Sequence, residues 1–422
     1  MLTKSPGVRA CLAAGCLAAG CAQAPPAATA LRVWAHEGRQ AEREVLQDQI
    51  ARFNQSHPGL PMQLTFLPEG GYNSQIQAAA LAQELPDLLE FDGPFVYGYA
   101  WQGCLQPLER QLAPATLENL LPTLKAQGSY DGHLYSVGNF DSGLALYGRK
   151  SWLNKVAARL PRHPREAWTV REFDEIMTRL SRLDPDGQVL DLKLNYRGEW
   201  FTYGFAPLLE SAGAGLFSEK VGQARGWLDS APSVRVLTAL QGWIQAGRVD
   251  PNPDDDAFCA GRVCLSWAGH WEYPRYSARW GNDLILLPLP DFGRGSRTAQ
   301  GSWNWGVTKN CQQVGAACQF LEFLLEDHQV LEMTSANGAV PATRSAIQRS
   351  PLYGQDGPCQ LFAVQLAEGY AVVRPRTAAY PVITSVFQHA LRDVLQGGEV
   401  PFTLRWAAQC IDSDVAENRG YR

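Results

Sequence analysis

The order of secondary-structure signals predicts an α/β fold built on a parallel sheet. Strand-like and helix-like segments alternate as β-α-β-α-β in the stretches 31–35, 41–53, 62–67, 72–83 and 86–91. The chain has 422 residues, of which 45% are hydrophobic and 19% are charged. Its length predicts two domains or one large bilobal unit with a substantial core.

The five segments are each marked by periodicity and by turn residues. The first strand, 31–35 (LRVWA), alternates apolar and polar residues, and the helix 41–53 ends before the Ser-His-Pro-Gly sequence at 56–59. The third strand reads PDLLEF at 86–91. Ligands of parallel sheets bind outside the carboxyl ends of the strands. These ends lie here at 35–37, 68–70 and 92–93.

The remainder of the chain continues the mixture of helices and strands. The clearest helix is 168–183, where Thr169 as N-cap and Glu172 three residues later form a capping box. Further helices are predicted at 234–246, 316–326 and 383–396, and further strands at 262–267, 284–289 and 306–308.

The N-terminus carries the same pentapeptide twice, LAAGC at 12–16 and again at 17–21, after the basic residues Lys4 and Arg9. Small residues that run into a cysteine are typical of a bacterial lipoprotein signal, so we expect residues 1–21 to be a signal peptide with Cys21 lipidated. Cys16 fits the same pattern. A plain secretory peptide and an Ala-rich cytosolic leader are the alternatives. Residues 22–30 (AQAPPAATA) form a linker.

The leader predicts where the protein resides. We expect it to be exported to the periplasmic or extracellular face and held at a membrane by a lipid anchor. The apolar stretch 10–20 is too short to span a bilayer as a helix, and no later segment approaches the ~20 apolar residues required. The net charge of −5, with no long charge run, argues against a nucleic-acid partner.

Seven cysteines follow the leader, and an exported chain can oxidise them. The pairs expected from their spacing are Cys259–Cys264, Cys311–Cys318 and Cys359–Cys410, with Cys104 left free. Six cysteines allow 15 connectivities, so other pairings stay open. The absence of a CxxC motif from the sequence disfavours zinc, and we expect no metal and no cofactor.

Eight segments in order resemble the sugar-binding family of ABC-importer solute-binding proteins, typified by maltose-binding protein. Four of these segments lie in the first half of the chain. PDLL (86–89) resembles the family's "PDI", and DGHLYSV (131–137) resembles its "DGKLYGLP". LALYGRK (144–150) resembles "LYYNKDLF", and WTVREF (168–173) resembles "TWDEF". Four follow: FCAGRVCLS (258–266) resembles "FxxGKAAM", SWNWGV (302–307) "GGWGLAI", NGAVPA (337–342) "GxxPxR", and Arg374-Pro375-Arg376 with Tyr380 "RP…Y".

The resemblance implies a periplasmic-binding-protein-like fold, with two α/β lobes, a hinge and a ligand cleft between the lobes. Residues 31–141 and 305–339 would form the N-lobe, and 142–304 and 340–422 the C-lobe. The protein would bind a carbohydrate as a monomer, close around it by hinge motion and deliver it to the permease subunits of an ABC importer.

A sugar site needs aromatic platforms for the C–H faces of the sugar, and carboxylates or guanidinium groups for its hydroxyls. His36 is a weaker candidate at the end of the first strand. The principal candidates lie at predicted strand ends, in loops or in the motifs above. They are Glu37, Tyr72, Asp92, Asp141, Trp200, Trp271, Trp303, Trp305 and Arg374.

Other functions make different demands. A glycan hydrolase needs two carboxylates roughly 5–10 Å apart, which Asp92 and Asp141 could supply, but no catalytic triad or HExxH motif is present, and we expect no enzyme. The sequence leaves two alternatives undecided. The protein could be a sugar receptor that feeds a sensor instead of a permease, and its ligand could be a polyol or a glycerol-phosphate compound. A phosphate would favour several cations at helix N-termini, and only Arg374 and Arg344 qualify, which favours a neutral di- or oligosaccharide.

Overall fold

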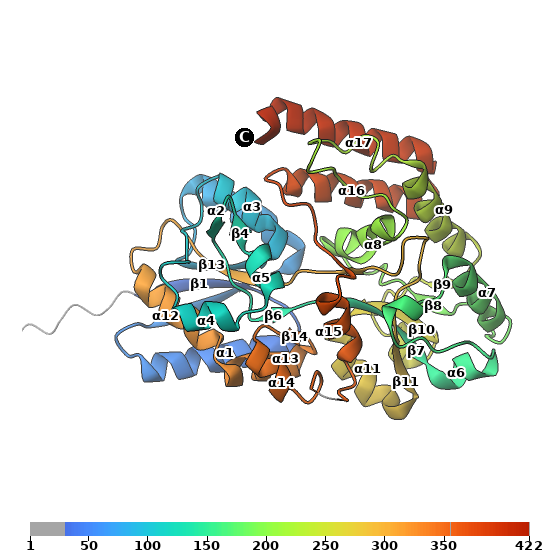
Figure 1. Cartoon of the computed structure of the whole chain (residues 1–422), viewed down its shortest axis with the longest axis horizontal. Helices are drawn as coiled ribbons and strands as arrows, with labels where there is room; N and C mark the ends of the chain where they lie inside the picture. The colour runs from blue at the N-terminus through green and yellow to red at the C-terminus, as the bar shows by residue number, and fades with distance from the viewer. Residues whose placement is uncertain (1–29, 355, 422) are drawn as a thin grey trace, which may run out of the picture.

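Two β-sheets organise the chain into two lobes, which lie side by side in the computed structural model (Figure 1). The structure describes residues 30–354 and 356–421. The predicted signal peptide, Cys21 and nearly all of the linker lie outside the described residues. Within the described part, no helix combines the length and the apolar character needed to cross a membrane.

The first lobe contains the predicted parallel sheet. Its strand order is β13-β3-β1-β2, with β1 (Leu31–His36), β2 (Met62–Leu67), β3 (Leu88–Asp92) and β13 (Trp303–Val307). Strand β1 pairs in parallel with β2 and β3, whereas β13 returns from late in the chain and pairs antiparallel with β3. The helices of this lobe are α1 (Gln40–Ser56), α2 (Tyr72–Ala82), α3 (Val96–Trp101), α4 (Pro114–Asn119), α5 (Pro122–Gln127), α12 (Val314–Leu324) and α13 (Asp327–Asn337).

The second lobe is built on a five-stranded sheet of order β11-β7-β10-β8-β9. Its strands are β7 (Leu144–Arg149), β8 (Leu190–Asp191), β9 (Val249–Asp250), β10 (Leu265–Gly269) and β11 (Leu284–Leu287). The larger helices around it are α7 (Val170–Ser181), α8 (Trp200–Ser211), α9 (Ala231–Gln245), α11 (Tyr273–Trp280), α16 (Tyr380–Leu395) and α17 (Val400–Glu417). Shorter elements of this lobe are α6 (Lys150–Lys155), α10 (Ala257–Ala260) and α15 (Gln360–Ala367). The hairpin of β4 (Ser129–Tyr130) and β5 (His133–Leu134) packs beside α3, and α14 (Arg344–Arg349) packs on α13 of the first lobe.

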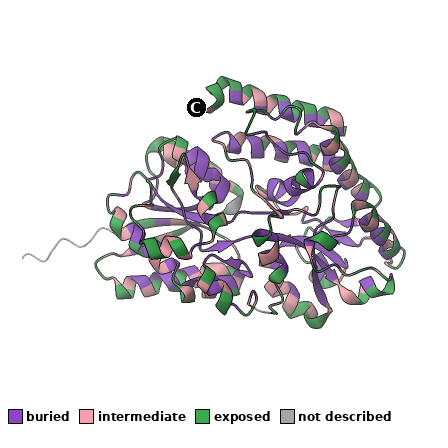
Figure 2. Ribbon diagram, in the orientation of Figure 1, coloured by how far each residue is buried: buried purple, intermediate pink, exposed green. Residues whose placement is uncertain are grey.

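The two faces of each sheet carry separate hydrophobic clusters, and the strands between them are mostly buried except for the edge strand β2 (Figure 2). In the second lobe, Leu144 and Leu146 of β7 pack on one face, while Ala145 and Tyr147 pack on the other. This alternation is the ordinary consequence of strand geometry. The predicted α/β class is therefore confirmed, with helices covering both faces of each sheet.

Local signals explain two of the second-lobe helices. In α7 the side chain of Thr169 accepts a hydrogen bond from the Glu172 backbone N–H, and the Glu172 carboxylate accepts one from the Thr169 N–H, so the predicted capping box is confirmed. Helix α8 was not predicted, because it is apolar around its whole circumference and contains Pro207. Nearly all of its residues are buried, which removes the amphipathic period that a sequence pattern needs.

Two short strand pairs form between segments that are distant in sequence. Strand β6 (Phe140–Asp141) pairs with β14 (Val340–Pro341), and β12 (Thr298–Ala299) pairs with β15 (Ala371–Val372). Figure 1 shows β6 between the two lobes. Each pair therefore ties together distant stretches of chain near the junction of the lobes.

The predicted disulfides are wrong for the described residues, because all seven cysteines there are free. Cys359 packs in the cluster of Tyr147, whereas α17, which carries Cys410, packs on the opposite face of the same sheet. The Cys264 thiol points to the Val189 carbonyl oxygen at 3.7 Å, and burial raises its pKa to about 12. Burial likewise raises the pKa of Cys311 to about 11 and that of Cys318 to about 12.

Candidate functional site between the lobes

A buried guanidinium group joins the two lobes. Asp92 ends β3 in the first lobe, and Arg374 follows β15 beside the second. Arg374 donates two parallel hydrogen bonds to Asp92, Nη1 to Oδ2 and Nη2 to Oδ1, both at 2.6 Å. The Arg374 side chain is 3% exposed. This two-point geometry is the strong form of an ion pair, because it fixes orientation as well as distance.

A second carboxylate, Glu199, shares the same guanidinium group. It lies at the N-cap of α8 and accepts a hydrogen bond from Arg374 Nη1 at 3.1 Å. It also accepts bonds from the Tyr380 hydroxyl and from Thr384 Oγ1, the latter at 2.8 Å. Burial raises the pKa of Glu199 to about 7, with Asp92 adding to the rise and Arg374 opposing it.

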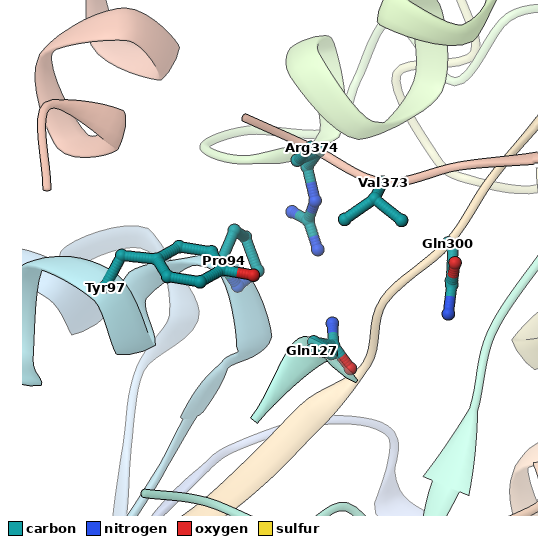
Figure 3. Close-up of a pocket in the computed structure, with 6 residues that line it drawn as sticks. All are labelled: Pro94, Tyr97, Gln127, Gln300, Val373 and Arg374. Carbon is teal, nitrogen blue, oxygen red and sulfur yellow. The ribbon is translucent and has the colours of Figure 1, made fainter. Parts of the chain in front are cut away.

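A small pocket of about 10 Å³, roughly the space of one water molecule, lies beside this cluster (Figure 3). Its lining residues come from both lobes and the segments between them: Pro94, Tyr97, Gln127, Gln300, Val373 and Arg374. In Figure 3, the Gln127 amide and the Arg374 guanidinium group point into the same space. The Tyr97 hydroxyl and Gln127 Oε1 are buried without a hydrogen-bond partner among the described residues. Buried polar atoms of this kind are expected where a ligand or water binds.

One glycine allows the backbone to pass close to the cluster. Gly301 has φ +116°, a conformation that side chains rarely adopt. A Cβ atom there would lie 2.5 Å from Gln127 Nε2 and 2.8 Å from Arg374 Nη2. The glycine therefore leaves room for both side chains.

Aromatic rings of the second lobe lie next to the charges. The Arg374 guanidinium carbon is 5.1 Å from the centre of the Tyr203 ring, and Tyr203 lies 6.0 Å from Trp271. Trp271 in turn meets Trp200 edge-on at 6.1 Å. Trp200 was expected in a loop, but it begins α8, is buried, and donates its Nε1–H to the Leu192 carbonyl.

A second aromatic group lies in the first lobe. Trp303 stacks on His36, with ring centres 3.7 Å apart and an interplanar angle of 2°, and meets Tyr72 edge-on at 5.2 Å. Trp303 is also the β13 residue paired with Asp92. The Tyr72 hydroxyl donates to the Glu90 carbonyl oxygen, and His36 Nδ1 lies 2.7 Å from Glu90 Oε2.

The other candidates from the sequence lie in three different settings. Asp141 is buried, and its carboxylate accepts bonds from Thr123 Oγ1 at 2.8 Å and from Gln300 Nε2 at 3.4 Å; burial raises its pKa. Trp305 packs in the first-lobe core, 6.2 Å from Phe320. Glu37 is exposed just after β1.

The sequence analysis did not select several polar groups that face this cluster or the pocket, Tyr97 among them. Glu199, which immediately precedes the selected Trp200, caps a helix that the sequence did not reveal. Tyr203 lies one turn further along the same helix. Gln127 and Gln300 come from a helix end and from a connection between lobes, and glutamines in such places carry no sequence signal.

Two α/β lobes with a buried polar site between them define a class of two-lobed binding proteins. Residues 48–357 match the family described as bacterial extracellular solute-binding protein, and the chain belongs to this family. No curated protein sequence matches the chain.

Solved structures agree with the fold. The GacH receptor of Streptomyces glaucescens, studied unliganded and with acarbose, is 22% identical with a TM-score of 0.78, over 93% of this chain and 99% of that one. A solute-binding protein of Thermotoga lettingae bound to α-D-tagatose is 20% identical with a TM-score of 0.78, over 91% and 99%. MalE of Bdellovibrio bacteriovorus bound to maltotriose is 18% identical with a TM-score of 0.76, over 92% and 100%.

Proposed function

We propose that the protein binds a neutral carbohydrate, a di- or oligosaccharide, between its lobes and delivers it to the permease of an ABC importer without chemical turnover. The observation that carries this proposal is the buried Asp92–Arg374–Glu199 cluster beside the rings of Tyr203 and Trp271. Charged donors and acceptors next to aromatic faces match the two surfaces of a sugar.

The charge balance of the cluster favours an uncharged ligand. Two carboxylates share the single guanidinium group of Arg374, so the cluster has no surplus positive charge to attract a phosphate. Arg344, the other cation considered, begins α14 rather than lining the pocket. A glycerol-phosphate ligand is therefore the weaker alternative. The solved structures named above, whose ligands include acarbose, tagatose and maltotriose, support a sugar.

The proposal also covers the division of the chain into lobes and the attachment of the protein to the membrane. We assign residues 31–141 and 303–339 to the N-lobe, since β13 begins at Trp303, and 142–302 and 340–422 to the C-lobe. Lipidation of Cys21 would tether a monomer at the membrane beside its permease. Mass spectrometry of the protein isolated from membranes tests the anchor, because a diacylated or triacylated Cys21 has a defined added mass.

Calorimetry against mono-, di- and trisaccharides, polyols and a glycerophosphodiester tests the ligand class. We expect heat from at least one sugar and no sugar consumption on prolonged incubation. Heat from the glycerophosphodiester alone would overturn the neutral-sugar proposal.

Asp92→Ala tests the site itself. We expect the dissociation constant to rise more than tenfold, because a carboxylate that accepts hydroxyl bonds contributes about 1.5 kcal/mol or more. The variant also frees Arg374 from its principal partner. Asp48→Ala, which removes an exposed carboxylate of α1, is the matched control and should leave affinity unchanged. Equal affinities of the two variants would remove Asp92 from the site.

A further inference from the structure

A second ion-pair cluster crosses between the lobes just beyond the carboxyl end of β1. Arg39 follows β1 and immediately precedes α1, so its backbone belongs to the first lobe. The Glu42 carboxylate fixes this turn, because it accepts bonds from the Arg39 backbone N–H at 2.8 Å and from Asn337 Nδ2 at 3.0 Å. The Arg39 side chain leaves its own lobe from this anchored position.

The partners of Arg39 all belong to the second lobe. Its Nη2 donates to the Tyr196 hydroxyl at 2.7 Å and to the Glu272 carboxylate, and both terminal nitrogens lie 3.3 Å from Asp255 Oδ2. These residues follow β8, β9 and β10, which are parallel to one another and so end at one edge of the sheet. The first lobe thus contributes a single side chain and the second lobe three acceptors.

The second-lobe half of this cluster is held in place by its own cations. Lys193 is buried and contacts Asp255 at 2.9 Å, Asp191 at 3.3 Å and Glu272 at 3.6 Å. Arg275 contacts the far oxygen of Glu272 at 2.7 Å. Burial would raise the pKa of Asp255, but Lys193, Arg39 and Arg275 lower it below its usual value.

The backbone around these residues is also fixed. Lys193 and Asp255 both have positive φ angles, +54° and +57°, which non-glycine residues adopt at an energetic cost. A conformation of this kind persists only where its surroundings hold it. The acceptors and the cations that hold them therefore form a preorganised socket. We define this socket as Lys193, Tyr196, Asp255, Glu272 and Arg275.

We propose that Arg39 is a closure latch, which docks into this preorganised socket and holds the two lobes together before any ligand arrives. The latch sets the balance between open and closed lobes, and through it the affinity for ligand. The proposal rests on the two-lobed binding function inferred above, but its primary test requires no ligand.

The latch contrasts with Arg52, a matched arginine on the helix α1 that Arg39 precedes. The Arg39 side chain is 42% exposed and the Arg52 side chain 41%. Arg52 also forms an ion pair, with Glu332, but Glu332 lies on α13 of the same lobe. Opening the lobes would break the Arg39 contacts and leave those of Arg52 intact.

Small-angle X-ray scattering of the ligand-free protein tests the latch. We expect Arg39→Gln to increase the radius of gyration and Arg52→Gln to leave it unchanged. An exposed ion pair shifts a two-state equilibrium by up to about fivefold, and the affinity for a bound sugar should fall by a similar factor. High salt should expand the wild-type protein toward the Arg39→Gln value, because it screens the pair.

Tyr196→Phe supplies a second variant that removes one acceptor hydroxyl while keeping the ring, and it should expand the protein in the same direction by less. Equal radii of wild type and Arg39→Gln, with both folded, would overturn the latch. If affinity falls without expansion, Arg39 is a ligand contact and the latch is wrong. If no sugar binds at all, the sugar proposal fails while the scattering comparison still decides the latch.

Discussion

The two arginines that cross between the lobes differ in burial. Arg374 is 3% exposed and makes a two-point pair with Asp92, whereas Arg39 is 42% exposed and meets a socket that has cations of its own. Removing Arg374 leaves two acids in a buried site without their shared cation. Removing Arg39 leaves Asp255 and Glu272 still paired with Lys193 and Arg275. The same residue type therefore affects folding stability at one position and lobe closure at the other.

The largest effect is expected for Arg374→Ala. Breaking a buried ion pair from one side costs roughly 3–5 kcal/mol of unfolding free energy, because the remaining charge stays desolvated. Urea denaturation measures it. Arg171→Ala is the control, since Arg171 pairs with Glu175 on the exposed face of α7 and should contribute well under 1 kcal/mol. If Arg374→Ala lowers the unfolding free energy no more than Arg171→Ala does, the burial of Arg374 has no special effect on stability.

The Asp92–Arg374–Glu199 cluster also predicts a pH dependence of folding stability. Glu199 has its pKa raised from 4.5 to about 7, so between these values the folded protein retains a proton that the unfolded chain releases. The stabilisation is complete below pH 4.5 and is lost as pH rises through 7, by up to about 3 kcal/mol. Denaturation at several pH values should show this decline in wild type and a flatter profile in Glu199→Gln. If the wild type and Glu199→Gln lose stability in parallel as pH rises, Glu199 is not the source of the pH dependence.

The sequence predicted the β-α-β-α-β elements that begin the first lobe, and it selected Asp92 and Arg374 of the site, but it did not predict helices α3, α4, α5 and α13. The alternating apolar pattern of β1 and the PDLLEF strand were sufficient to place Asp92 at a strand end, which β3 confirms. These signals are local, because each depends on periodicity within one segment. The α/β class followed from the same segments, whereas the family resemblance rested on eight short motifs spread between residues 86 and 380.

The rest of the site depends on contacts between distant segments. Glu199 meets Arg374 across 175 residues, and Arg39 meets Glu272 across 233. No local period records such a pairing. The disulfide prediction failed for the same reason, since sequence spacing could not reveal that Cys359 packs on the sheet face opposite to α17.

The smallest effect on stability is expected for Arg39→Gln, and its size tests the contrast between Arg39 and the buried Arg374. The Arg39 side chain keeps 42% of its surface exposed, and the socket cations keep Asp255 and Glu272 paired when Arg39 is lost, so the loss should stay near that of a surface pair, about 0–1 kcal/mol. The unfolding free energy should therefore fall by less than about 1 kcal/mol, close to that of Arg52→Gln. The scattering radius and the sugar affinity, rather than the unfolding free energy, should separate these two variants. A loss comparable to that of Arg374→Ala would mean that Arg39 supports folding rather than closure.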